Sequence, residues 1–154
     1  MTRYELLKFL HVGGAIAWVG GGLGLLLLTR RLVAAGDHAG VLALSRQSKA
    51  IGNVLFVPAS LVTVASGITL VALEAGLAFT DLWILIGFGG IAASGAAQMV
   101  VAAPAESAFV TATADYGLDS PQVAAAARRL GLGNSLDVGL LLIVVWVMVA
   151  KPTL

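Results

Sequence analysis

The sequence predicts an all-α fold, an integral membrane four-helix bundle that forms a single transmembrane domain over residues 1–154. Hydrophobic residues make up 59% of the chain and charged residues only 11%, with a mean hydropathy of +0.99; soluble domains carry roughly 25% charged residues. Four apolar windows are each long enough to cross about 30 Å of hydrocarbon as a helix. Helices are favoured because backbone amides in lipid must pair within their own segment.

The first spanning helix is expected over residues 5–30. Its apolar run is too long for a secretory signal, and Arg30 and Arg31 follow it where a signal would have a small-residue cleavage site. We therefore interpret it as a retained helix. Small residues recur along it at four-residue spacing, which predicts close packing against another helix. They are Gly13, Ala17 and Gly21.

Residues 37–50 are predicted to form a short cytoplasmic helix in the loop that follows. Asp37 can cap its N-terminus. Its apolar Val41, Leu42 and Leu44 would lie on the membrane surface beneath the basic residues of the same loop. We expect this segment to be an anchor at the inner leaflet.

The second and third spanning helices are expected over residues 51–73 and 82–105. Neither segment contains a charged residue. Pro58 removes one backbone hydrogen bond from the second helix and is expected to bend it. Both helices carry small residues at four-residue spacing, so we expect a tightly packed bundle. These residues are Ala59, Thr63 and Gly67 in the second helix and Gly90 and Ser94 in the third.

The fourth spanning helix is expected over residues 128–150. A short cytoplasmic helix over 120–130 precedes it, with Ser120 as N-cap and Pro121 as first helical residue, and is expected to run into it. The spanning part contains one acid, Asp137.

The basic residues predict the orientation of the bundle. Six lie in the loops after the first and third helices, against three at the termini and in the middle loop, which predicts that those two loops are cytoplasmic and both termini outside. The six are Arg30, Arg31, Arg46, Lys49, Arg128 and Arg129, and the three are Arg3, Lys8 and Lys151.

The first helix carries the candidate cofactor site. At about 100° per residue, four of its residues share one face on which an imidazole projects from a stripe with little side-chain bulk; they are His11, Gly14, Ala15 and Trp18. The functional hypothesis is that His11 ligates a metal or a haem iron, the two small residues let the macrocycle lie close, and the indole stacks on it. The alternative is that His11 hydrogen-bonds to another helix and its neighbours only pack.

Asp137 is the second ionisable group inside a predicted span, and it approaches the midplane from the side opposite His11. It could orient a liganding His11 through a hydrogen bond, or relay protons with Asn134 on the same face. The alternative is an acid that faces the helix packing. Asn53, Gln98 and Asn134 all fall near cytoplasmic helix ends and predict either interhelical hydrogen bonds or a polar vestibule.

Several functional classes are disfavoured by what the sequence lacks. With no cysteine, the chain has neither disulfides nor thiolate metal sites. It contains no phosphate-binding or dinucleotide-binding glycine motif and no basic patch interleaved with aromatic residues, so we expect no nucleic-acid partner.

Three stretches carry a family resemblance. "LKFLHVGGAIAWVGG" resembles the first helix of a superfamily of small bacterial membrane proteins that includes copper-resistance protein D, the HemJ-type protoporphyrinogen oxidases and the DUF2269 family. "PASLVTVASGITLV" and "VVWVMVAKP" resemble the second helix and the C-terminal end of DUF2269 proteins. HemJ-type proteins pair the histidine with a lysine in the third helix, and this third helix has none. Copper transport also lacks support, because cysteine is absent and the methionines are isolated.

The resemblance implies a small protein of DUF2269 type in the bacterial inner membrane, with His11 as candidate ligand of haem b for a redox or electron-transfer role. No second histidine lies in a predicted span, since His38 is in a loop. The iron would then be five-coordinate, would take a methionine, Lys8 or water, or would be shared with another subunit. Whether the protein is an enzyme is left open.

The alternative function is a non-catalytic subunit or stabilising partner of a larger membrane complex, without a cofactor. Besides the lipid bilayer, its partners would then be further copies of the chain or other membrane subunits, docked through the small-residue rows. A transporter is least favoured, because no inverted repeat is visible.

Overall fold

The computed structural model describes residues 2–152, and in this range the chain forms four long helices and no strand. Three of them contain a π-helical turn, labelled η. The elements are α1 (Arg3–Ala15), η1 (Ile16–Gly20) and α2 (Gly21–Ala34); α3 (His38–Ile51), η2 (Gly52–Phe56) and α4 (Val57–Leu73); α5 (Leu82–Ala97), η3 (Gln98–Ala102) and α6 (Ala103–Tyr116); and α7 (Pro121–Ala150). All four long helices are apolar and long enough to cross a membrane, which confirms the predicted fold class.

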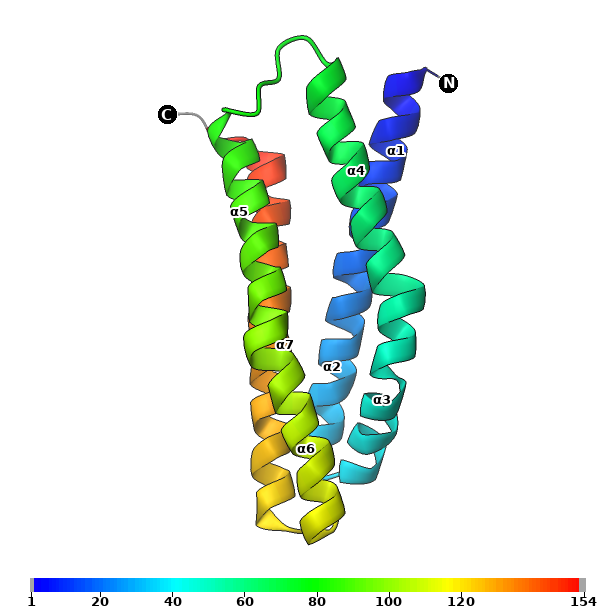
Figure 1. The fold of residues 1–154 in the computed structure, drawn as a ribbon, viewed down its shortest axis with the longest axis vertical. Helices are drawn as coiled ribbons and strands as arrows, with labels where there is room; N and C mark the ends of the chain where they lie inside the picture. Colours follow the sequence, from blue (N-terminus) through cyan, green and yellow to red (C-terminus); the bar gives the residue numbers. More distant parts are fainter. Residues whose placement is uncertain (1, 153–154) are drawn as a thin grey trace.

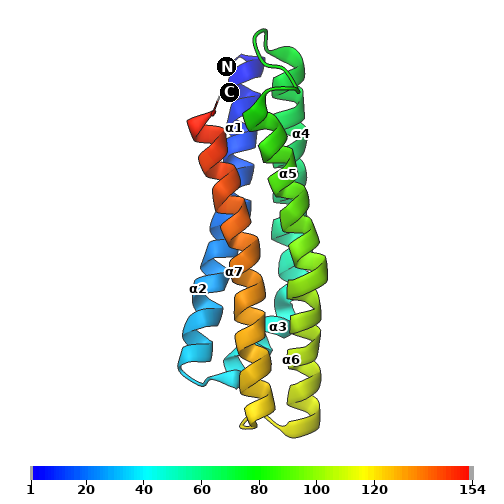
Figure 2. The same ribbon diagram turned by 90° about the vertical axis from the view of Figure 1, so that its left-hand side faces the viewer.

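The four helices run side by side along the long axis of the molecule (Figures 1 and 2). Both termini and the α4–α5 connection lie at one end, which we call the terminal end. The α2–α3 and α6–α7 connections lie at the other end, which we call the hairpin end. The two loops that are rich in basic residues therefore lie at the same end of the bundle.

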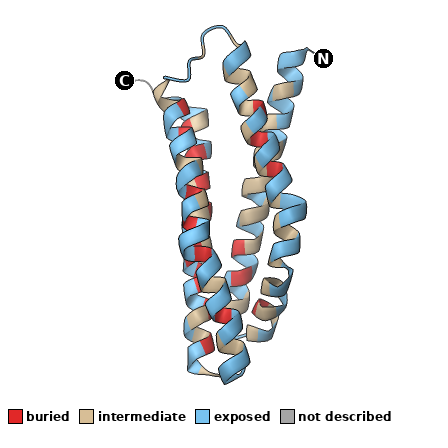
Figure 3. Cartoon of the chain, in the orientation of Figure 1, coloured by how far each residue is buried: buried red, intermediate tan, exposed pale blue. Residues whose placement is uncertain are grey.

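The helices associate differently at the two ends. Towards the terminal end, α1 packs along α4 and α5 packs along α7, which gives two separate pairs (Figure 1). Towards the hairpin end, α2, α3 and α6 all contact α7, and they enclose the most deeply buried apolar cluster. Its members are Val41, Phe109, Val123, Ala127 and Leu130. Figure 3 shows exposed residues over most of the outer surface and buried residues along the inner faces.

The helical segment that begins at His38 corrects one expectation. α3 is not a separate anchor on the membrane surface, because it continues through η2 into α4 as one helix of 36 residues. Val41 is only 1% exposed and packs against Phe109 of α6 and against α7. At about 1.5 Å per residue this helix is about 54 Å long, so it extends well beyond about 30 Å of hydrocarbon.

The end of the third helix also differs from the expected boundary, whereas the segment 120–130 runs into the fourth helix as expected. The third long helix continues through α6 to Tyr116, eleven residues beyond the expected end at Ala105. The segment 120–130 is the first part of α7, with Ser120 accepting a hydrogen bond from the backbone N–H of Val123. The cap at Ser120 and the buried residues Val123 and Ala127 of α7 thus extend the helical bundle beyond the expected spanning segments at the hairpin end.

Two of the π-helical turns precede prolines. η2 ends two residues before Pro58, and η3 ends two residues before Pro104. A proline ring clashes with the carbonyl four residues earlier and provides no N–H for it. The wider π turn accommodates this mismatch, so the expected distortion at Pro58 takes the form of a π turn just before it.

Small residues bring the helices of each pair close together. A Cβ atom added to Gly14 would lie 2.5 Å from the Thr63 Oγ1 atom and 3.1 Å from the Ala59 carbonyl oxygen. In contrast, a Cβ atom on Gly13 would meet nothing within 4 Å. The predicted row on the first helix was therefore wrong at Gly13. On the second and third helices the predicted rows do face partners, with Thr63 and Ser94 buried.

Candidate functional site

Two cavities of similar size lie between the helices, one in each half of the bundle. The terminal cavity, of about 470 Å³, lies between the α1–α4 and α5–α7 pairs and has a mainly apolar lining that includes His11, Lys8 and Lys151. The second, which we call the hairpin-side cavity, has a volume of about 460 Å³ and includes Trp18 and Asp137 in its lining. The two cavities share no lining residue in the described part of the chain.

The imidazole of His11 is held by the second long helix. Its Nδ1 atom lies 2.8 Å from the carbonyl oxygen of Thr63. A carbonyl oxygen can only accept a hydrogen bond, so Nδ1 carries the proton and donates it. In its neutral form a ring with the proton on Nδ1 has its lone pair on Nε2, which is the arrangement of a histidine that ligates a metal through Nε2.

Gly67 makes this position of the ring possible. A Cβ atom added to Gly67 would lie 2.8 Å from Cε1 and 3.0 Å from Nδ1 of His11. The imidazole therefore lies in the space that any larger residue at this position would fill. Gly67 was predicted as a packing residue, and its small size was the only signal in the sequence.

The Nε2 atom of His11 is free of protein partners. Within residues 2–152 no hydrogen bond involves it, and every fully enclosed side-chain nitrogen or oxygen in that range has a partner. Nε2 is therefore accessible rather than enclosed, and His11 lines the terminal cavity. A ligand in this cavity can reach a nitrogen whose lone pair is available.

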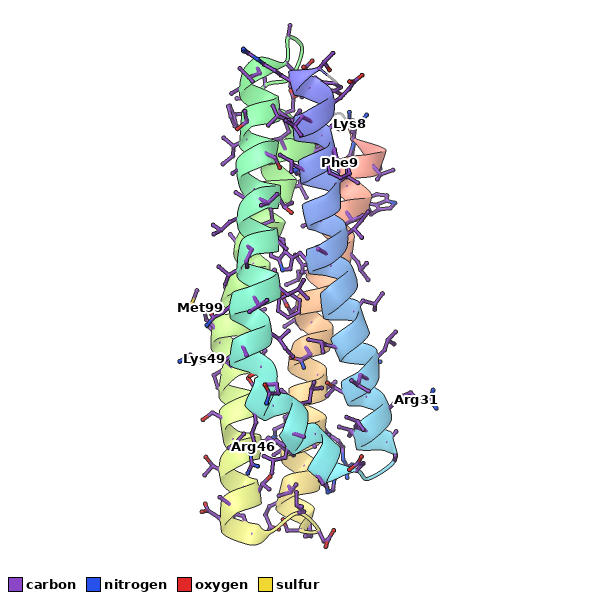
Figure 4. All side chains as sticks on the ribbon, turned by 90° about the vertical axis from the view of Figure 1, so that its right-hand side faces the viewer. Lys8, Phe9, Arg31, Arg46, Lys49 and Met99 are labelled. Carbon is purple, nitrogen blue, oxygen red and sulfur yellow. The ribbon has the colours of Figure 1, made fainter. Side chains whose placement is uncertain are left out.

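Two lysines lie at the outer part of the terminal cavity, each beside an aromatic ring. The Nζ atom of Lys8 is 5.7 Å from the centre of the Tyr4 ring, and that of Lys151 is 5.2 Å from the centre of the Trp83 ring. All four side chains line the cavity. Figure 4 shows Lys8 on the side of α1 next to the C-terminal end of α7. Sequence reasoning missed Lys151 as a site residue, because only the fold brings the first and last helices together.

The other three residues of the predicted face do not join His11. Gly14 faces α4 at close range, so no open space lies above it. Trp18 lines the hairpin-side cavity, and Ala15 lines neither cavity. Trp18 is seven residues beyond His11, which places it about 10 Å further along the helix towards the hairpin end.

Asp137 also lies apart from His11. The hydroxyl group of Ser94 on α5 donates a hydrogen bond to the Asp137 carboxylate, and both Asp137 and Asn134 line the hairpin-side cavity. The expected contact in which Asp137 orients His11 is therefore not formed, because the Thr63 carbonyl has that role. Of the three predicted polar residues, Gln98 and Asn134 line this cavity, whereas Asn53 is exposed and does not.

Comparison with known protein families identifies the family of this chain. A family model described as "Predicted integral membrane protein (DUF2269)" matches residues 5–152. The chain belongs to the DUF2269 family. A search of curated proteins and a search of solved structures each found no match. The family description establishes a membrane protein, so the chemistry of this DUF2269 protein has to be argued from its cavities.

The donor set decides which kind of metal group the terminal cavity of this DUF2269 protein could hold. Among residues 2–152, no three side chains of His, Asp or Glu gather into a group that could bind a bare ion. Structural zinc needs four protein ligands. A haem iron already has four porphyrin nitrogens and needs only one axial protein ligand. The single imidazole of His11 fits a haem better than a free ion.

Proposed function

We propose that this protein binds haem b in the terminal cavity, with the Nε2 atom of His11 as axial ligand, for a redox or electron-transfer role in the membrane. The observation that supports this most is the hydrogen bond from Nδ1 to the Thr63 carbonyl oxygen. Such a bond to the other ring nitrogen fixes the ring orientation and raises the basicity of a ligating histidine. Bound haem would supply a one-electron carrier.

The shape and charge of the cavity support the same ligand. A volume of about 470 Å³ lies within the roughly 300–1,000 Å³ that is usual for cofactor and small-molecule sites. Its mainly apolar lining suits a flat macrocycle. Lys8 and Lys151 line the same cavity, and their ammonium groups suit the two carboxylates that haem b carries on one edge.

We also propose the cellular setting. The excess of basic residues at the hairpin end favours that end as cytoplasmic, with both termini outside the bacterial inner membrane. The terminal cavity would then lie nearer the outer surface. The alternative function, a stabilising subunit of a larger membrane complex, predicts a protein that works without haem.

Haem binding is tested with purified protein expressed in cells that make haem. We expect the unchanged protein to have a Soret absorption band, and His11→Gly to lose it because the other histidine of the sequence, His38, lies at the hairpin end and bonds to the Leu118 carbonyl oxygen. Added imidazole should restore the band in His11→Gly, which a folding defect would not allow.

Asp137→Asn is the control variant, because Asp137 lines the other cavity and bonds to Ser94. We expect its Soret band to match that of the unchanged protein in position and intensity. A colourless unchanged protein that also takes up no added haem would contradict the proposal and favour the role as a subunit.

A further inference from the structure

We infer that the hairpin-side cavity is a water-filled vestibule that gives protons and small hydrophilic solutes from the hairpin end access to Asp137. This inference concerns the cavity that does not contain His11, and it is independent of haem binding. Asp137 would be a proton-exchange group that is reached by water.

The lining of the cavity is apolar in its larger part, but it includes polar side chains from all four long helices. Near its inner part lie Asp137 and, one turn towards the hairpin end, Asn134. Glu106 and Lys49 also line the cavity, and the side chain of Lys49 extends outward from the bundle (Figure 4). The remaining polar members are Thr29, Ser45, Ser48 and Gln98.

The space and the free polar groups suit water. A volume of about 460 Å³ exceeds several times the roughly 30 Å³ that one water molecule takes in the liquid, and a buried water needs two to four polar partners. Within residues 2–152 the side-chain amides of Asn134 and Gln98 make no hydrogen bond to protein; that of Asn134 is not fully enclosed, and Gln98 is an exposed residue. Polar groups that are reachable and unpaired in this region can be hydrated.

Asp137 is held in a defined position but keeps one oxygen free. The Ser94 hydroxyl donates to its Oδ1 atom, and Ser94 is only 2% exposed. The Oδ2 atom has no protein partner among the described residues and is not fully enclosed. The carboxyl group can therefore exchange a proton with water through Oδ2 while Ser94 holds its other oxygen.

The backbone around the cavity gives a second, independent observation. All three π-helical turns contribute to its lining, through Trp18 of η1, Phe56 of η2 and Gln98 of η3. π turns inside α-helices occur frequently at functional sites. The terminal cavity is lined by none of these turns, so the wide turns mark this region of the bundle specifically.

The arrangement also predicts access from one side only. The two cavities share no lining residue, so the described side chains show no connection from one to the other. A solute that enters from the hairpin end would reach Asp137 and stop there. The vestibule is thus expected to be a half-channel rather than a pore.

The test uses single cysteines, because the natural chain has none. Asn134→Cys places a thiol in the vestibule, and Leu136→Cys places a control thiol on the outer face of α7, where Leu136 is 48% exposed. Both variants are reconstituted in lipid vesicles and treated with a small charged methanethiosulfonate reagent. We expect labelling of Asn134→Cys to be at least about tenfold faster, since only a hydrated thiol forms the reactive thiolate.

Asp137→Cys measures how deep the water reaches. It is adjacent in the sequence to the control position 136, so the two thiols have nearly the same depth in the membrane. Labelling of Asp137→Cys at a rate near that of Asn134→Cys is expected. Equal, slow labelling of Asn134→Cys and Leu136→Cys would mean a dry cavity. Fast labelling at position 134 with none at 137 would mean that water stops short of Asp137; either result overturns the inference.

Discussion

The two cavities of this protein have nearly the same volume, about 470 and 460 Å³, and a mainly apolar lining, but their polar groups differ. The terminal cavity offers one nitrogen lone pair in an apolar space with two lysines at its outer part. The hairpin-side cavity offers a carboxylate among amides and hydroxyls. The difference teaches that one small bundle can hold a ligand site for a flat apolar group and a hydrated acid without contact between them.

The packing of the helices explains how the two regions stay separate. Near the terminal end the α1–α4 and α5–α7 pairs enclose a space that apolar side chains line. Near the hairpin end, three π turns widen the helices just before they converge on the cluster around Phe109, which is fully buried. The first arrangement leaves room for a rigid ligand, and the second leaves room for water beside the buried cluster.

The largest expected effect concerns which side of the membrane each cavity faces. Ala78 lies in the connection at the terminal end, and Ala39 lies near the start of α3 at the hairpin end; both are exposed. In intact cells an impermeant thiol reagent should label Ala78→Cys and leave Ala39→Cys unlabelled until the membrane is permeabilised. The reverse pattern would invert the orientation, and with it the side from which water reaches Asp137.

The next effect concerns the pair of helices that carries His11. Gly14→Ala adds a methyl group 2.5 Å from the Thr63 Oγ1 atom, so we expect it to destabilise the protein by about 1–3 kcal/mol, as overpacking does. Gly13→Ala is the matched control, because its methyl group would meet nothing within 4 Å. Thermal unfolding in detergent measures both. Equal melting temperatures would mean that α1 and α4 are not in close contact.

The smallest effect tests whether the position of the His11 imidazole, rather than the fold as a whole, determines haem affinity. Gly67→Ala places a methyl group 2.8 Å from the His11 ring and should displace the ring from the Thr63 carbonyl. We expect about 10–100-fold weaker haem binding, the usual cost of losing a partner that orients a ligand. Gly24→Ala, with nothing within 4 Å, should bind haem normally. Haem titration followed by absorption gives both affinities, and equal values would show that the Thr63 bond does not orient the ligand.

Local patterns were enough to predict the helices and several of their ends. Hydropathy predicts the spanning segments, because a stretch of about 20 apolar residues has few alternatives to crossing the bilayer. Asp37 and Ser120 cap helices as predicted, with their side chains accepting hydrogen bonds from Gly40 and Val123. Capping depends on residues within one turn, so the sequence contains the information.

Contacts between helices could not be predicted in the same way. His11 was recognised as a candidate, but its partner is a backbone carbonyl 52 residues away in the sequence, and every residue has a carbonyl. Asp137 was expected near His11 from its depth, whereas the fold directs it to Ser94. The sequence position of a residue in a spanning helix predicts its depth in the membrane. It does not predict which neighbouring helix the side chain faces.

The sequence by itself determined that this chain forms four membrane-spanning helices and belongs with DUF2269 proteins, because hydropathy and capping are properties of neighbouring residues. Only the tertiary structure decided that His11 and Trp18 line different cavities. The two residues are seven positions apart, about 10 Å along the helix, so one helix face passes both cavities. Where one cavity ends and the other begins depends on packing between distant segments, which a constant rotation per residue could not predict.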